Sequence, residues 1–133
     1  MDFSSLLKPG TEAQKAETVS DINTAAALGS GGLAVYSTPA MIALMERAAY
    51  SAVQAFLPAG WSTVGTELNV KHLSATPLGM KVYAKAELLN IDGRELSFKV
   101  EAFDEAGKIG EGVHTRFIIE VEKFMAKTGG KKA

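Results

Sequence analysis

The spacing of hydrophobic residues changes midway along the chain, from a helical period to an alternating one. Residues 40–56 carry apolar side chains around almost the whole circumference of a helical projection, and Glu46 is one of two charged exceptions. Pro39 suits the first position of such a helix, and Ser37 or Thr38 can cap it. Because a helix that is apolar all round is unsuited to water, the pattern predicts a long helix buried on most sides.

The second half of the chain alternates apolar and polar residues in four successive segments, which is the period of β-strands. The expected strands cover residues 63–74, 82–88, 96–102 and 113–121. Short turns between them predict an antiparallel sheet with one apolar face, and the single long helix is available to cover that face. We therefore expect the hotdog fold of the α+β class, a curved antiparallel sheet wrapped around one central helix. An open-faced α+β sandwich is the alternative.

The rest of the chain is less regular. Residues 16–22 are expected to form a short strand, and residues 25–32, which are rich in alanine and glycine, a loop. A length of 133 residues and a hydrophobic content of 47% fit one domain with one core over residues 1–133. Its ends, residues 1–10 and 126–133, are expected to be flexible.

Charge and composition exclude several classes of function. The formal net charge of -1 provides no basic surface for nucleic acid. The sequence has no cysteine, which excludes disulfides and thiolate metal sites, and no run of about 18 apolar residues that would span a membrane. We expect a cytoplasmic location, no nucleic-acid or membrane partner and, because an open sheet has exposed edge strands, a homodimer.

Three polar residues stand in apolar surroundings. Glu46 shares a helical face with Ile42 and Val53, and His72 follows apolar residues on the inward face of the strand that the helix covers. Thr38 adds a hydroxyl at the helix start, where free backbone N–H groups can stabilise an oxyanion. We expect these three to form a reactive cluster. Each also has a structural explanation: solvent exposure or an ion pair for Glu46, a satisfied core position for His72 and a helix cap for Thr38.

The alternation also assigns side chains to the two faces of the sheet. On the first long strand, Thr66 is expected on the same inward face as His72. On the last strand the apolar face carries Val113 and Phe117, which puts His72 and His114 on opposite faces of their strands. With no further carboxylate at a suitable spacing, we expect no metal site.

Four longer stretches carry a family resemblance. They are TPAMIALME at residues 38–46, VGTELNVKHLSATPLGM at 64–80, AELLNIDGRELSFKVEA at 86–102 and GEGVHTRFIIEVEKFMAK at 110–127. With these motifs the chain resembles the fluoroacetyl-CoA thioesterase-like family of small hotdog proteins, and the resemblance covers nearly the whole chain.

The resemblance implies an activity and a site. Family members hydrolyse acyl-CoA thioesters as homodimers, with the active site at or near the subunit interface, and need no metal or redox cofactor. Thr38, Glu46 and His72 match the catalytic threonine, glutamate and histidine of the family, and whether Glu46 or Thr38 is the nucleophile or the base stays open. Gly65 matches a glycine beside the substrate carbonyl, and Arg116 matches an arginine near the end of the substrate.

The chain departs from the family before the long helix. Gly29, Gly31 and Gly32 stand where the fluoroacetyl-CoA enzyme carries phenylalanines, which leaves the acyl group open. We expect a thioesterase that acts on a small or medium acyl-CoA without a strong preference for the fluoroacetyl group. The alternatives are an acyl-CoA binding or sensing module without catalysis, and a hotdog hydratase or an enzyme that acts on acyl-carrier protein.

Overall fold

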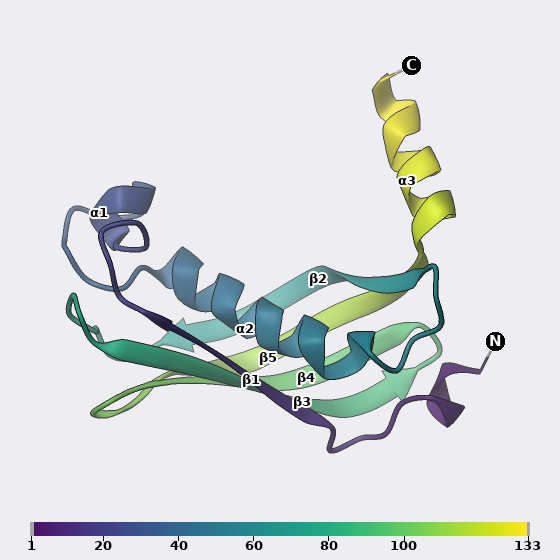
Figure 1. The fold of residues 1–133 in the computed structure, drawn as a ribbon, viewed down its shortest axis with the longest axis horizontal. Helices are drawn as coiled ribbons and strands as arrows, with labels where there is room; N and C mark the ends of the chain where they lie inside the picture. The colour runs from purple at the N-terminus through teal and green to yellow at the C-terminus, as the bar shows by residue number, and fades with distance from the viewer. Residues whose placement is uncertain (1, 133) are drawn as a thin grey trace.

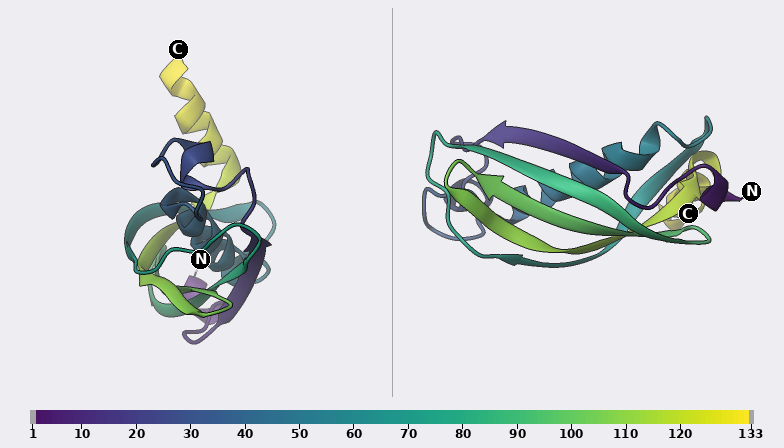
Figure 2. Two further views of the ribbon diagram at one scale, coloured as in Figure 1. Left: turned by 90° about the vertical axis from the view of Figure 1, so that its left-hand side faces the viewer. Right: turned by 90° about the horizontal axis from the view of Figure 1, so that it is seen from below.

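The structure, a computed structural model, describes residues 2–132 (Figure 1). In chain order its elements are η1 (Phe3–Ser5), β1 (Glu12–Thr18), α1 (Ala25–Leu28), α2 (Thr38–Gln54), β2 (Trp61–His72), β3 (Lys81–Asp92), β4 (Glu95–Asp104), β5 (Gly107–Glu120), α3 (Val121–Gly129) and η2 (Gly130–Lys132). The five strands form one antiparallel sheet that curves around α2, and the views in Figure 2 show this curvature from the side and from below. The predicted arrangement of a curved sheet around one long helix is confirmed.

The strand order β1-β3-β4-β5-β2 differs from the order along the chain. Strands β3, β4 and β5 form a meander with tight turns at Gly93 and at residues 105–106. Strand β2 pairs with β5 and not with β3, so the segment after β2 carries the chain across to the other side of the sheet. Strand β1 pairs with the free side of β3. The two edges of the sheet are therefore β1 and β2.

Helix α2 lies across the concave face of the sheet. Ser37 caps it, because the Ser37 hydroxyl accepts the backbone N–H of Ala40 at 3.1 Å. The buried face of the helix consists of Ala40, Met41, Leu44, Met45, Ala48, Ala49, Ala52 and Val53. A stripe that includes Ala43, Arg47 and Tyr50 is exposed, so the helix is buried over one broad face and not on most sides as predicted.

Two segments near the N-terminus differ from the prediction. Strand β1 lies earlier than the expected residues 16–22, because pairing with β3 and not its own weak periodicity sets its bounds. The expected loop at residues 25–32 contains the single-turn helix α1. Thr24 caps α1 by accepting the N–H of Ala27 at 3.1 Å, and Gly29 ends it with a φ of 71°.

Helical turns occur near both ends of the chain. Phe3 and Leu7 are buried in the core, and α3 with η2 extends away from the sheet (Figures 1 and 2). The part of the prediction that concerns residues 1 and 133 lies outside the described residues. None of the helices in the described part of the chain is long and apolar enough to cross a membrane.

The inner face of β5 is polar where an apolar face was predicted. His114, Arg116 and Ile118 face α2 and are buried, whereas Val113 and Phe117 lie on the outer face and are 47% and 40% exposed. The prediction followed hydrophobicity alone, which places Val113 and Phe117 inside. Buried polar groups are tolerated when they have hydrogen-bond partners, and both His114 and Arg116 have them.

Candidate functional site

The first group of predicted site residues lies at the N-terminal end of α2. Because Ser37 supplies the helix cap, the Thr38 hydroxyl is free to bond elsewhere, and its Oγ1 lies 2.7 Å from Nδ1 of His72 at the end of β2. Thr38 is therefore not the helix cap, and His72 is bonded to it. This is the contact of a hydroxyl with a base that nucleophilic or acid–base chemistry requires.

His72 is suited to remain unprotonated at neutral pH. Its Nε2 is buried and has no hydrogen-bond partner among the described residues. Burial lowers the pKa of the imidazole below its ordinary value, because a charged ring is poorly solvated there. A neutral ring can accept the proton of the Thr38 hydroxyl.

A cavity of about 290 Å³ opens beside Thr38 and His72. It is lined by Ala25, Ser30, Val35, Tyr36, Thr38, His72, Leu73, Ser74 and Ala75. These residues come mainly from two segments, α1 with the glycine-rich stretch that follows it and the loop after β2. The two segments meet at the Thr38–His72 pair. The segment in which the family resemblance fails therefore borders the reactive pair.

Glu46 lies in a second group of residues, further along α2. Its Oε2 is 3.8 Å from Nη1 of Arg116, and the Glu46 and Arg116 side chains are 38% and 7% exposed. A separate cavity of about 320 Å³ is lined by Ala43, Glu46, Arg47, Tyr50 and Arg116. Glu46 is thus half-open to solvent and faces a buried cation, which matches the ion pair that the sequence left as an alternative.

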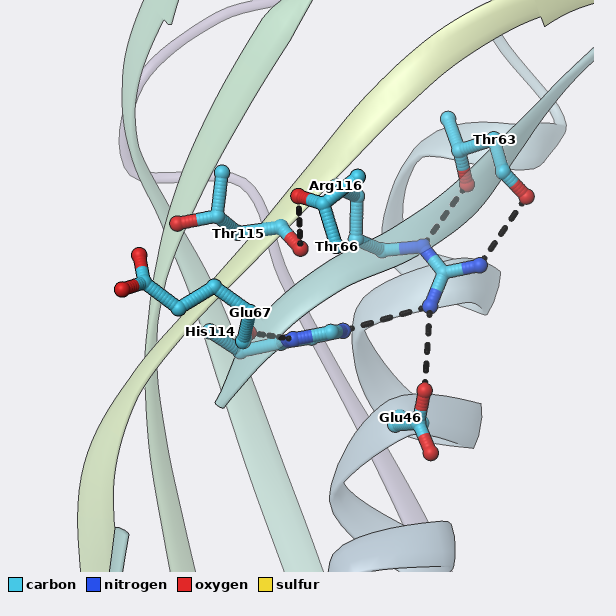
Figure 3. Close-up of polar contacts among 7 residues, drawn as sticks. All are labelled: Glu46, Thr63, Thr66, Glu67, His114, Thr115 and Arg116. Carbon is cyan, nitrogen blue, oxygen red and sulfur yellow. Dashed lines mark hydrogen bonds and ion pairs between the residues drawn. The ribbon is translucent and has the colours of Figure 1, made fainter. Parts of the chain in front are cut away.

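Arg116 is fixed by several hydrogen bonds at once (Figure 3). Its Nε donates to Oγ1 of Thr63 at 2.8 Å, its Nη2 donates to the Thr63 carbonyl at 3.0 Å, and its Nη1 lies 3.2 Å from Nε2 of His114. The charge that faces Glu46 is therefore held in one place.

Gly65 gives this group its space. A Cβ atom on Gly65 would lie 2.8 Å from Oε2 of Glu46, 3.1 Å from Cε1 of His114 and 3.4 Å from Nη1 of Arg116. The glycine is needed here because any side chain would occupy the volume in which the carboxylate meets the guanidinium.

The structure thus brings some of the predicted site residues together and separates others. Thr38 pairs with His72, and Glu46 lies with Gly65 and Arg116. Thr38 and Glu46 are eight residues apart on one helix, which is about 12 Å along its axis. Within one chain, the three residues expected to form a single cluster do not meet.

Sequence reasoning gave no role to Thr63 and His114. Both lie on the inner face of the sheet. His114 is two residues from Arg116 on the same strand and therefore points to the same face, which is the signal in the sequence that could have found it. The expectation that His72 and His114 lie on opposite faces was wrong. His72 is inward as expected, but His114 is inward too. The error arose because the inner face of β5 was assigned from Val113 and Phe117. A separate error concerns Thr66, which was expected inward but is exposed, because a register shift between Gly65 and Glu67 forms a bulge there. No group of three metal-ligating side chains occurs within residues 2–132.

Comparison with known proteins identifies the family of the chain. The family model of the fluoroacetyl-CoA-specific thioesterase FlK matches residues 19–122. The chain is 42% identical over 97 residues to the fluoroacetyl-CoA thioesterase of Streptantibioticus cattleyicolor, which covers 73% of this chain and 70% of that protein.

Solved structures agree as well. A structure of FlK superimposes with a TM-score of 0.88 at 34% identity, over 94% of this chain and 97% of that one. A thioesterase superfamily member from Thermus thermophilus has a TM-score of 0.87 at 28% identity, over 94% and 93% of the two chains. A hot-dog-like protein from Thermanaerovibrio acidaminovorans has a TM-score of 0.91 at 24% identity, over 100% and 98%, and supports the fold alone.

These matches confirm the hotdog fold and the assignment as a thioester hydrolase. They span most of the chain, including both groups of site residues. The chain belongs to the family of fluoroacetyl-CoA-specific thioesterases.

Proposed function

We propose that the protein hydrolyses small or medium acyl-CoA thioesters to a free acid and CoA, with Thr38, His72 and Glu46 as its reactive groups. Family membership supports the reaction class. The observation that carries the assignment of residues is the contact of 2.7 Å between the Thr38 hydroxyl and the imidazole of His72. A binding module has no need of such a contact beside its cavity.

The reaction requires few groups. The oxygen of a water molecule bonds to the carbonyl carbon of the thioester, the C–S bond breaks, and the CoA sulfur leaves and takes up a proton. Either Glu46 removes the proton from the attacking water, or Glu46 or Thr38 attacks first and water then hydrolyses the acyl-enzyme. In each route neutral His72 can take up and return a proton through Thr38. Backbone N–H groups at the start of α2 are suited to the developing oxyanion.

We further propose that a homodimer completes the active site. Reacting groups must lie within about 3.5 Å of one another, so the separation of Glu46 from Thr38 along α2 calls for a group from a second copy. Strand β2 pairs with β5 on one side only, and its outer side has no strand partner among the described residues, which favours pairing with another β2. Antiparallel pairing of β2 with itself, in a register centred near residues 68–69, would bring Gly65 alongside the partner's His72. Glu46, which lies beside Gly65, would then approach the Thr38–His72 pair of the partner.

The acyl group is proposed to lie in the cavity beside Thr38 and His72. Its lining includes the small residues Ala25 and Ala75. This leaves room for groups larger than acetyl. The same cavity volume fits acyl chains of several carbons but not the CoA part of the substrate, which must extend outward.

The test is release of free CoA from a panel of acyl-CoAs, followed with a thiol reagent. Turnover well above the uncatalysed rate for at least one small or medium acyl-CoA is the expected result. Tight binding of acyl-CoA with no release of thiol would instead assign the protein as a binding module. Loss of the double bond of an enoyl-CoA with the thioester intact would assign it as a hydratase.

A further inference from the structure

His114 is among the most deeply buried polar residues of the described chain. Its side chain is inaccessible to solvent, and its ring lies 6.2 Å from that of Phe98. The ring nitrogens nevertheless have partners. Nδ1 lies 2.8 Å from the carbonyl oxygen of Glu67 on β2, and Nε2 lies 3.2 Å from Nη1 of Arg116 on the same strand (Figure 3).

These two partners determine the protonation of the ring. A carbonyl oxygen only accepts, so Nδ1 must carry the hydrogen that it donates to Glu67. A guanidinium only donates, so Nε2 must present its lone pair to Arg116. Both contacts require the same neutral tautomer. A second proton on Nε2 would place an N–H and a positive charge against the N–H of Arg116.

Burial favours this neutral form. Burial lowers the pKa of His114 most, the hydrogen bond to the backbone of Glu67 raises it, the charge of Arg116 lowers it and that of Glu46 on α2 raises it. The net shift is downward.

The bulge in β2 supplies the acceptor. The register of β2 against β5 shifts between Gly65 and Glu67, and the extra residue, Thr66, donates its hydroxyl to the Thr115 carbonyl at 3.1 Å. The Glu67 carbonyl accepts from a side chain of the neighbouring strand at this point. Bulges of this kind redirect groups next to active sites.

We propose that His114 is a positioning residue, which acts as a fixed neutral acceptor and holds Nη1 of Arg116 toward Glu46. The inference rests on the proposed function, because the position of Glu46 matters only if that carboxylate reacts. Thr63 fixes Nε and Nη2 of Arg116. Without His114, Nη1 would lose its hydrogen-bond acceptor. The guanidinium could then turn, and Nη1 would no longer be held toward the half-exposed Glu46 carboxylate.

Two substitutions separate the two bonds of the ring. His114→Asn keeps a donor at the position of Nδ1, so it can bond to Glu67, but it does not reach Arg116. His114→Gln places an acceptor near the position of Nε2, so it can bond to Arg116. We expect kcat/KM to fall by about tenfold or more in His114→Asn and to recover in large part in His114→Gln. A general structural role predicts the reverse order, or losses that follow the thermal midpoints of the two variants.

A double-mutant cycle tests whether His114 acts through Arg116. In an Arg116→Gln background, His114→Asn should change kcat/KM by less than about twofold, because the group to be positioned is gone. Equal losses from His114→Asn in both backgrounds would overturn the proposal.

Two-bond ¹H–¹⁵N NMR of the histidine rings provides a readout that does not depend on turnover. We expect a proton on Nδ1 and none on Nε2 of His114 at pH 7, and a rise in the pKa of His114 in Arg116→Gln, because a like charge has been removed. A proton on Nε2 would overturn the proposal. If the parent protein hydrolyses no acyl-CoA, the proposed function has failed, and the NMR measurement still decides whether His114 holds Arg116.

Discussion

Replacement of Gly65 by alanine should lower activity strongly while it lowers stability only slightly. In Gly65→Ala, the new methyl group would lie 2.8 Å from Oε2 of Glu46. An ordinary contact begins at about 3.4 Å, so the carboxylate must move by roughly 0.6 Å or more. The backbone at Gly65 does not have a positive φ, so alanine is compatible with the strand.

The two neighbours of the new methyl group differ in how easily they move. The Glu46 side chain is 38% exposed and can rotate toward solvent at little cost, whereas His114 is fully buried at 3.1 Å and must shift by a few tenths of an ångström. We expect a loss of stability of about 1 kcal/mol or less. Misplacement of a reacting group on this scale lowers the rate by a factor on the order of 10 to 100.

The assay is kcat/KM on the best acyl-CoA, together with the thermal midpoint measured on the same preparation. Gly130→Ala is the matched control: a Cβ there would meet nothing within 4 Å and its φ is -60°, so both quantities should stay at parental values. Parental kcat/KM in Gly65→Ala would refute the reasoning, because it would mean that the position of the Glu46 carboxylate at Gly65 has no part in the reaction.

Three further predictions concern the reactive groups, the pH dependence of stability and the choice of acyl group. Glu46→Gln and His72→Ala should each lower kcat/KM by a factor on the order of 10² or more while the protein stays folded; near-parental rates in both would make these residues structural. Because burial lowers the pKa values of His72 and His114, the unfolded chain binds more protons below pH 6.5. The thermal midpoint should therefore fall as the pH drops below that value and hold above it, and His114→Gln should reduce the fall; an unchanged midpoint from pH 7 to 5 would contradict this. The ratio of kcat/KM for fluoroacetyl-CoA to that for acetyl-CoA should stay below a thousand, because an apolar pocket discriminates by only about 1 to 3 kcal/mol, and butyryl-CoA should be accepted. A ratio of a thousand or more would contradict this prediction.

The sequence predicted the elements whose signals are local. The cap at Ser37, Pro39 in the first turn and the apolar residues of α2 belong to one short stretch, and the alternation in β3 and β4 is nearly regular. The bounds of β1 were missed because they depend on pairing with β3, which is distant in sequence. The turn of α1 was missed because its alanines and glycines are equally compatible with a loop.

The candidate site was predicted in its residues but not in its arrangement. Thr38 and His72 are 34 residues apart and meet because the end of β2 lies beside the start of α2. From the sequence, His72 was placed on the face that the helix covers but was expected to meet Glu46 as well. The bulge at Thr66 could not be inferred from alternation, and it brings Thr63 and Gly65 in place of Thr66 onto the face that carries His114. The distance of Glu46 from Thr38 follows from helix geometry, and the proposal of a site shared by two subunits rests on it.

Mixing of two inactive variants tests the central claim most directly, which is hydrolysis of acyl-CoA at a site that two subunits share. Glu46→Gln and His72→Ala protein would be dissociated together, reassociated and assayed for release of CoA, with each variant treated alone as the control. If Glu46 acts with the partner's His72, half of the dimers are mixed and each of these has one complete site, so about a quarter of the parental activity should return. No recovery in a preparation shown to contain mixed dimers would contradict the account, because it would mean that Glu46 and His72 act within the same chain or not at all.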